Sequence, residues 1–495
     1  MSKPSRPILK KRSGSARTSL PLAVALLALT FLAAGLCSCS VERTQVEPPV
    51  QAPAGFSTNG PAETPAEWWT SFNDPDLNSL VEEALRDSFS LRVAWDRLDQ
   101  ARAVAARSRA PLWPSLDGSA GASQTASHSP GTPLGAGGTD HTTQFSFGLQ
   151  AGYEVDLWGR VRSAADAALL DAQAAEQDLQ AAAITLSVDM ARTWFRLAEQ
   201  QAQLALVGKQ LETNRKYLEA ITLRFRRGKV GATDVLQQRQ LVEANRGERA
   251  LIESNIRVLE HQLAVLLGKP PGSFRPDAPN ALPELPSLPD TGLPAEWIRR
   301  RPDVRAAELR VQAADQRVAA AIADRFPKLS LGLTASTSTE DLRDLFDNWA
   351  ASVAASLVAP LFDAGLRKAE VERTRAVMSQ QLHSYGQVVL TSLKEVEDAL
   401  AREARQAEYV RSLGEQLDLS RQAKEQTLDN YAKGTADFTR YLTTLLSYQQ
   451  LQRSHLQARR DLVLFRIDLY RALAGGWSLP RADRADPGED GKRTR

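Results

Sequence analysis

Residues 159–226 read GRVRSAADAALLDAQAAEQDLQAAAITLSVDMARTWFRLAEQQAQLALVGKQLETNRKYLEAITLRFR, a run without proline. Apolar side chains recur every seven residues along its second half, at Leu197, Leu204, Leu211, Leu218 and Phe225, with Val207 and Ile221 three positions after members of that row. Such a repeat marks a helix that lies along a partner in a left-handed coiled coil. We therefore predict one helix from Gly159 to Arg226, roughly 100 Å long.

A second stretch, from Leu366 to Asn430, repeats this design less regularly. Glu403 interrupts its seven-residue row, and a neighbouring row bridges the interruption. The interrupted row is Leu382, Val389, Val396, Val410 and Leu417, and the bridging row is Leu393, Leu400 and Ala407. Two helices of this length exceed what a single globular core needs, so a tube or a stalk is predicted.

The N-terminus has the layout of an export signal. Six basic residues precede an uncharged apolar run from Leu20 to Leu36, which is followed by Cys37-Ser38-Cys39. This layout is typical of a secretory signal peptide rather than a membrane-spanning helix. The small residue before Cys39 resembles a bacterial lipobox, so we expect residues 1–38 to be removed and Cys39 to be lipidated. Ser40, by resemblance to bacterial lipoproteins, implies sorting to the outer membrane. An ordinary cleaved signal peptide with an incidental cysteine is the alternative.

Removing this leader changes the charge and the cysteine count. The chain has 61 basic and 59 acidic side chains, and the leader holds six of the basic ones and no acid, which leaves 55 against 59. Without a clustered basic face, no nucleic-acid partner is expected. Cleavage before Cys39 also removes Cys37, so no disulfide is expected.

The segment after the lipid site changes character twice. Residues 39–67 are rich in Pro, Glu and Ala, which predicts an extended, lipid-anchored linker. Helical periodicity follows Trp68-Trp69, breaks at Asp87-Ser88 and resumes from Leu91 to Ala110. Two prolines then end the helix.

Beyond these prolines the apolar period changes to that of a strand. Between Phe145 and Leu157, apolar and polar side chains alternate without a miss. A long strand with one apolar and one polar face suits a membrane barrel between lipid and water. A weaker alternation precedes this strand. We therefore predict two strands, at about residues 115–126 and 142–157. The segment Thr125–Thr143 between them is predicted to be a polar exterior loop.

The same order of elements recurs in the second half of the chain. Pro114-Ser115-Leu116 matches Pro327-Lys328-Leu329 at a shift of 213 residues. Six identities on the preceding helix keep that shift: Arg92, Ala94, Arg97, Ala101, Ala106 and Ala110 match Arg305, Ala307, Arg310, Ala314, Ala319 and Ala323. Alternating residues predict two further strands at about 328–338 and 348–362.

The ends of the long helices match as well. Phe225-Arg226-Arg227-Gly228 matches Tyr431-Ala432-Lys433-Gly434 at a shift of 206 residues. A glycine in the left-handed conformation is the usual stop of a helix. Gly228 and Gly434 are therefore the predicted helix-reversal turns.

Each half thus reads helix, strand, strand, long helix, turn, helix. We predict a first repeat at residues 68–268, a Pro-rich connector at 269–293 and a second repeat at 294–475, with a disordered tail at 476–495. Pro302-Asp303 is predicted to start a helix, with a proline at its first position and a carboxylate near its positive end. The fold class is mainly α with a membrane β-barrel part and a two-fold internal repeat.

Five motifs stand out in the order in which they occur: Trp68-Trp69…Phe72…Asp74-Pro75…Leu77, Tyr153-Glu154-Val155-Asp156-Leu157-Trp158-Gly159-Arg160, Arg300-Arg301-Pro302-Asp303-Val304-Arg305-Ala306-Ala307-Glu308, Pro360-Leu361-Phe362-Asp363-Ala364-Gly365 and Glu395-Val396-Glu397-Asp398-Ala399-Leu400. By these motifs the chain resembles a TolC-like outer-membrane efflux protein of the lipoprotein (NodT-type) subgroup, from about Trp68 to Gly475.

The resemblance implies a homotrimer in the outer membrane of a Gram-negative bacterium. Each copy would give four strands to one shared barrel and its helices to one periplasmic α-helical tunnel. A periplasmic adaptor (membrane fusion) protein and an inner-membrane RND-type pump are the implied partners, beside outer-membrane lipid. Independently, an open sheet edge in lipid leaves backbone groups unpaired at a cost of several kcal/mol each, so the copies are expected to share their barrel.

No catalytic residue, metal site or cofactor is predicted, and the chain is not expected to be an enzyme. The five histidines have no metal-ligand spacing: His128, His141, His261, His383 and His455. His128, Asp140 and His141 share the predicted loop, which is weak evidence for a metal. Gly135-Ala136-Gly137-Gly138 neither follows a strand nor opens a helix, so it is not a phosphate loop.

In TolC-like channels, carboxylate rings and aromatic or basic contacts near the periplasmic tips hold the tunnel shut. The corresponding gate candidates are Asp234, Asp437, Arg440 and Tyr431. Arg440 and Thr443 stand where the family often has acids, so this chain departs from the usual aspartate ring. The alternative for the two aspartates is a helix-start charge that the dipole stabilises. For Tyr431 and Phe225, a place in the coiled-coil seam is favoured over a gate contact.

Two classes of function remain. The first is a passive export conduit for drugs or other toxic small molecules, with type I protein secretion as its alternative. The second is a non-transporting periplasmic coiled-coil lipoprotein. The alternating strands favour the conduit, because a spacer has no use for lipid-facing β-segments. Within the conduit class, the lipid anchor favours drug efflux by resemblance.

Overall fold

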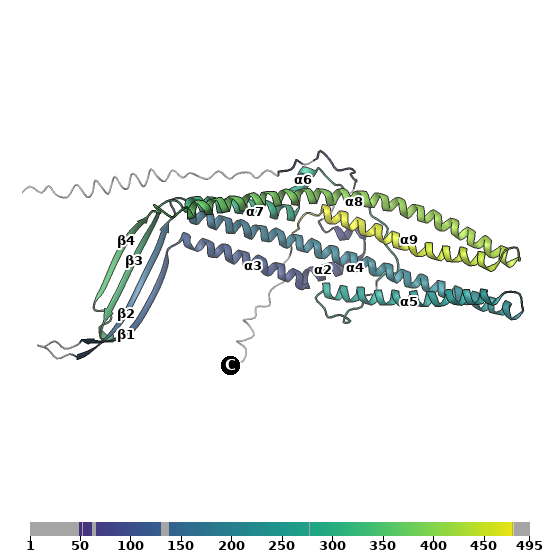
Figure 1. Cartoon of the computed structure of the whole chain (residues 1–495), viewed down its shortest axis with the longest axis horizontal. Coiled ribbons are helices and arrows are strands. Elements are labelled where there is room, and N and C mark those ends of the chain that lie inside the picture. Colours follow the sequence, from purple (N-terminus) through teal and green to yellow (C-terminus); the bar gives the residue numbers. More distant parts are fainter. Residues whose placement is uncertain are drawn as a thin grey trace, which may run out of the picture. The chain divides into compact units, whose positions relative to one another are not determined.

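The computed structural model describes residues 49–51, 53–61, 66–129, 138–276, 278–477 and 479. The first half contains η1 (Trp68–Phe72), α2 (Pro75–Asp87), α3 (Phe89–Arg109), η2 (Ala110–Leu112), β1 (Ser115–Ser129), β2 (Gly138–Val155), α4 (Arg160–Arg226) and α5 (Ala232–Leu266). The second half contains α6 (Pro294–Ile298), α7 (Pro302–Ala323), β3 (Lys328–Thr339), η3 (Leu342–Asp344), β4 (Trp349–Val358), α8 (Leu366–Ala432) and α9 (Phe438–Leu473). The predicted two-fold repeat of helix, two strands, long helix and helix is confirmed (Figure 1).

The two long helices start in the same way. Gly159 and Gly365 precede α4 and α8 with φ of 75° and 87°, a conformation that favours glycine. Asp156 then accepts hydrogen bonds from two amides of the first turn of α4, at 2.8 and 3.2 Å. Asp363 accepts one from the first turn of α8 at 3.3 Å. These carboxylates satisfy orphan amides and oppose the helix dipole, so both motifs direct the chain from strand into helix.

α4 is the helix that most of the other helices contact. It contacts α3, α5, α7 and α9, while α8 contacts α7 and α9. Figure 1 shows the four strands side by side, leading from α3, α4, α7 and α8. α4 and α8 have 67 residues each. Within the described ranges, no helix is both long and apolar enough to cross a membrane.

Aromatic side chains form the centre of the core between η1, α4 and α9. Trp68 stacks on Tyr470 with ring centroids 5.7 Å apart, and Phe72 meets Phe195 at 5.0 Å. Trp194 is fully buried beside them. Large aromatic surfaces give this short N-terminal segment enough burial to hold it on the helices.

Asp74 links this core to the start of α2. Its Oδ1 accepts from the Leu77 amide at 3.0 Å, and its Oδ2 accepts from Trp194 Nε1 at 2.8 Å. We expect Asp74→Ala to lower the free energy of unfolding by about 2 kcal/mol, because it removes a helix cap and leaves a buried indole N–H unpaired. Denaturant unfolding of the detergent-extracted protein measures this. Asp76→Ala is the control, because Asp76 is exposed in the same turn; equal losses in both variants would contradict the assignment.

Only part of the seven-residue apolar row of α4 is buried against the other helices. Leu197 and Leu211 are buried, but Phe225 is 44% exposed in this chain. Val207 and Ile221 are buried, and so are the amide side chains of Gln210 and Asn214. An α-helix drifts by about 20° per heptad relative to a 3.5-residue repeat, so a strict seven-residue row turns away from its partner.

Polar side chains also pair across the contact between α4 and α9. Asn214 and Gln449 exchange two amide hydrogen bonds of 3.1 and 3.2 Å. One step along, Gln210 donates to Gln452 at 2.9 Å. Buried amides stay stable only when paired, so these bonds set the register of the two helices.

The interruption at Glu403 is a buried ion pair. Arg466 of α9 donates to both carboxylate oxygens of Glu403, with its Nε at 2.8 Å. Its Nη1 also donates to the carbonyls of Pro286 and Ser287 in the connector. Burial works against the guanidinium charge, but the bonds to Glu403 outweigh it and raise the pKa of Arg466. The pair therefore fastens the connector to α8 and α9.

The strands form one antiparallel sheet in the order β1-β2-β3-β4. The expectation of a loop from Thr125 to Thr143 is wrong, since β1 and β2 pair as far as Ser129 and Gly138. Backbone pairing requires no apolar side chains, so composition alone underestimates strand length. β4 ends at Val358 rather than near residue 362, because Pro360 has no amide to donate.

Candidate functional site

The sheet has two chemically different faces. Because paired residues lie in register, alternation along each strand becomes a continuous face across all four strands. On the apolar face, one row of paired residues across the four strands is Leu116, Ala151, Leu333 and Val353. The adjacent row, on the polar face, is Asp117, Gln150, Thr334 and Ser352. The sheet is therefore built to separate an apolar from an aqueous phase.

Exposed aromatic rings lie at both ends of the strands. Where strands meet helices, Trp158 stacks on Phe326 at 4.9 Å, and its Nε1 donates to the carbonyl of Pro327 at 2.8 Å. At the other end Phe346 contacts Phe147 at 6.0 Å, and Trp349 is 74% exposed. Aromatic rings at two levels are typical of membrane–water interfaces.

Both outer strands have one free edge in this chain. Among the residues that the structure describes, β1 pairs only with β2, and β4 pairs only with β3. In water such edges invite pairing with another chain, and in lipid their unpaired amides and carbonyls cost several kcal/mol each.

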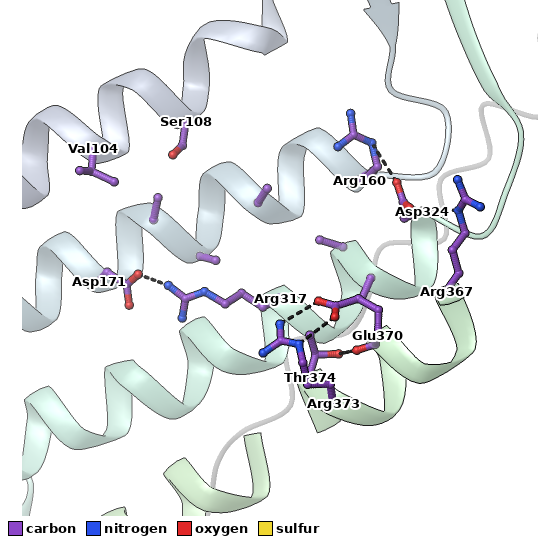
Figure 2. Close-up of a pocket in the computed structure, with 15 residues that line it drawn as sticks. Val104, Ser108, Arg160, Asp171, Arg317, Asp324, Arg367, Glu370, Arg373 and Thr374 are labelled. Atoms are coloured by element: carbon purple, nitrogen blue, oxygen red, sulfur yellow. Dashed lines mark hydrogen bonds and ion pairs between the residues drawn. The ribbon is translucent and has the colours of Figure 1, made fainter. Parts of the chain in front are cut away.

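A pocket of about 460 Å³ lies where the sheet meets the helices, lined by side chains of α3, α4, α7 and α8 (Figure 2). Alanines form much of its apolar wall: Ala164, Ala167, Ala168, Ala320 and Ala321. Four arginines surround it, and each is paired: Arg160 with Glu154, Arg317 with Asp171, Arg367 with Asp324 and Arg373 with Glu370.

Asp324 is the centre of this network. It pairs with Lys328 at 2.7 Å and with Arg367 at 3.2 Å. Partial burial raises the pKa of Asp324, but these cations outweigh it and hold the pKa below its usual value. Glu154 and Lys328 belong to the polar face of the sheet and pair with Arg160 and Asp324, which line the pocket.

The histidine and aspartate candidates for a metal lie on paired strands rather than in a loop. His128 lies opposite Thr139, and His141 lies opposite Ala126. The described part of the chain contains no group of three or more His, Cys, Asp or Glu placed to hold a metal ion. In the pocket, the carboxylates of Asp171, Asp324 and Glu370 are paired with arginines.

The helix-reversal turns have the same geometry in both hairpins. Gly228 and Gly434 have φ of 69° and 79°. The Lys229 amide donates to the Arg224 carbonyl at 3.0 Å, and the Thr435 amide donates to the Asn430 carbonyl at 2.9 Å. This pairing closes a helix end around a left-handed residue, so any side chain at either glycine is strained.

An aromatic cluster joins the two hairpins near these turns. Tyr431 of α8 lies 5.6 Å from Phe438 and 6.3 Å from Tyr441, both of α9. Tyr217 of α4 meets Tyr441 at 5.4 Å. The guanidinium of Arg224, also on α4, lies 4.7 Å from the Tyr431 ring centroid. Burial raises the pKa of the Tyr441 hydroxyl far above its usual value, so that hydroxyl stays neutral.

The gate candidates differ in their surroundings. Asp437 caps α9, with its Oδ1 accepting from the Arg440 amide at 2.7 Å. Asp234 lies in the first turn of α5, and Arg440 is exposed. In the described residues, no ion pair joins the three, and Tyr431 alone belongs to the aromatic cluster. Cys39 lies outside the described residues.

Sequence reasoning missed Arg224 and Tyr441 as partners of Tyr431. Arg224 precedes Phe225, the last residue of the seven-residue apolar row of α4. By that point the row has turned away from the helices that α4 contacts. The drift of an α-helix relative to a seven-residue repeat could have predicted this contact, because it brings Arg224 rather than Phe225 toward α8.

The chain is similar to known outer-membrane proteins. The model of a family described as "Outer membrane efflux protein" matches residues 80–269 and 293–475. The chain is 31% identical over 432 residues to the pyoverdine export outer membrane protein OpmQ of Pseudomonas aeruginosa, covering 84% of this chain and 88% of the relative. It is 32% identical over 423 residues to the toluene efflux pump outer membrane protein TtgI of Pseudomonas putida, covering 82% and 87%.

Solved structures agree with this similarity. The outer-membrane channel OprN superposes with a TM-score of 0.79 at 29% identity, over 87% of this chain and 99% of that one. CusC, described with transmembrane channel formation, superposes with a TM-score of 0.74 at 25% identity over the same shares. The match extends over the sheet and the helices together.

Proposed function

Because this chain belongs to the outer membrane efflux protein family and is an outer-membrane channel of an efflux pump, we propose that three copies assemble into one duct. Each copy contributes four strands to a shared barrel and its long helices to a periplasmic tunnel. The observation that carries the proposal is the sheet: an apolar and a polar face in register, with free edges at β1 and β4. Pairing β4 of one copy with β1 of the next removes every open edge.

Toxic small molecules are the proposed cargo. OpmQ is named for pyoverdine export and TtgI for toluene efflux, and both names support a small-molecule cargo. A periplasmic adaptor and an inner-membrane RND-type pump are the proposed partners that supply the energy, since the named relatives are components of efflux pumps. Lipidation of Cys39 anchors each copy to the outer membrane.

Oligomer mass and phenotype test these proposals. The detergent-extracted protein is expected to have the mass of a trimer, with circular dichroism dominated by helix and a smaller strand component. Deleting the gene is expected to raise sensitivity to several unrelated toxic compounds. A water-soluble monomer contradicts the duct. Unchanged sensitivity with loss of one secreted protein favours type I secretion instead.

The helix-reversal turns are the proposed gate. Asp234, Asp437 and Arg440 lie within the first turn of α5 or at the start of α9, and Tyr431 lies in the aromatic cluster that holds the two hairpins together. Of these, Tyr431 has the strongest support, because it contacts both α4 and α9. The Asp437 carboxylate already serves as a helix cap, so it has less freedom to bind a neighbour.

Tyr431→Ala is expected to raise the open probability of the duct on the order of tenfold. The substitution removes two ring contacts and a cation–π contact, which together are worth about 1–3 kcal/mol. Single-channel recording in planar bilayers measures the change. Tyr409→Ala removes an equivalent ring from an exposed position of α8, so it is the control. An unchanged open probability in Tyr431→Ala contradicts the role of this residue.

A further inference from the structure

The first helix-reversal turn carries an excess of free positive charge. Arg226, Arg227 and Lys229 follow one another around Gly228, and all three side chains are exposed. In the part of the chain that the structure describes, their charged groups make no ion pair or hydrogen bond. Arg440, at the start of α9, is exposed and unpaired in the same sense.

The acidic side chains near the turns do not balance this charge. Asp429 pairs with Lys433 at 2.5 Å, and Asp437 caps α9. Asp234 is the remaining carboxylate near the first turn, and it is half-buried. The four cations Arg226, Arg227, Lys229 and Arg440, here called the turn cations, therefore outnumber the two carboxylates that no cation of the described chain pairs with, Asp234 and Asp437.

The helix dipoles do not neutralise the turn cations either. The C-terminus of α4 contributes roughly −0.5 charge and the N-terminus of α5 roughly +0.5, and the two ends lie next to each other. Their fields largely cancel, so the side chains set the sign of the local potential. A potential of one sign at a narrow entrance raises the local concentration of counter-ions.

We propose that the turn cations make the periplasmic entrance of the duct attractive to anionic solutes, so that the assembled protein conducts small anions better than small cations. This rests on the proposed function, since it requires three copies to bring their turns together around one entrance. The effect is confined to the turns, because the Debye length is about 10 Å at 0.1 M salt.

Reversal potentials in planar lipid bilayers test the proposal on the purified full-length protein, with a KCl gradient and chloride and potassium as probes. The wild type is expected to favour chloride over potassium on the order of threefold near 0.1 M, and less near 1 M, where the Debye length is only about 3 Å. The variant R226Q/R227Q/K229Q is expected to bring the ratio close to one.

A matched control removes three exposed cations far from the turns. In K209Q/K368Q/R405Q the exposed positions lie along α4 and α8, and this variant is expected to keep the wild-type ratio. Potassium preference in the wild type, an unchanged ratio in the turn variant or an equal change in the control overturns the proposal. If the turn cations serve only to bind a partner protein, the chloride-to-potassium ratio of the turn variant is expected to stay unchanged. Absence of any conductance instead overturns the duct on which the inference rests.

Discussion

Val353→Arg is expected to keep the protein out of the outer membrane. Val353 lies in the middle of β4 on the apolar face of the sheet, in register with Leu333 and Ala151, and is 82% exposed. An arginine on the lipid face near the bilayer midplane costs about 2–4 kcal/mol per copy. With three copies in one barrel the cost is roughly tripled, which is comparable to the whole net stability typical of folded proteins.

The measurement is the fraction of protein recovered as trimer from outer membranes. Ser352→Arg is the matched control, because Ser352 is the next residue of the same strand and lies on the polar face. That change removes only a 2.7 Å hydrogen bond between hydroxyls, to Thr334. We expect trimer to be lost in the Val353 variant and largely retained in the Ser352 variant. Equal recovery of both would mean that the apolar face does not meet lipid.

Glu403→Ala is expected to lower the free energy of unfolding by about 3–5 kcal/mol, because it leaves the buried guanidinium of Arg466 without its partner. The two side chains are 9% and 4% exposed, so water cannot replace the lost carboxylate. Thermal or denaturant unfolding of the detergent-extracted protein measures the change. The connector is expected to loosen as well, since Arg466 also holds the carbonyls of Pro286 and Ser287.

Two comparisons separate burial from charge pairing as the cause. Glu408→Ala breaks an ion pair of 2.8 Å with Arg405, whose side chain is 78% exposed, and is expected to cost less than about 1 kcal/mol. In the double variant Glu403→Leu/Arg466→Met, no buried charge remains unpaired, so the loss is expected to be smaller than in Glu403→Ala alone. A larger loss in the double variant would contradict the ion-pair explanation.

The architecture was readable from local patterns. The change of period after Pro114 and the alternation from Phe145 to Leu157 predicted the strands, because side-chain direction alternates along any strand. The glycines at positions 228 and 434 marked the turns, since few other residues adopt a left-handed helix end. These properties depend on neighbouring residues alone, so the two-fold repeat, the sheet and the long helices followed from the sequence.

Strand length, the true seam of α4 and the partners of Tyr431 depended on the tertiary structure. β1 and β2 continue through polar residues because each backbone finds a partner across the hairpin. The seam of α4 departs from its leucine row because helical drift accumulates over many turns. Glu403 appeared to be an interruption, and only the position of Arg466, 63 residues further along the chain, makes it a buried ion pair. Local patterns are set by bonded neighbours, whereas these contacts are set by which distant segments pack together.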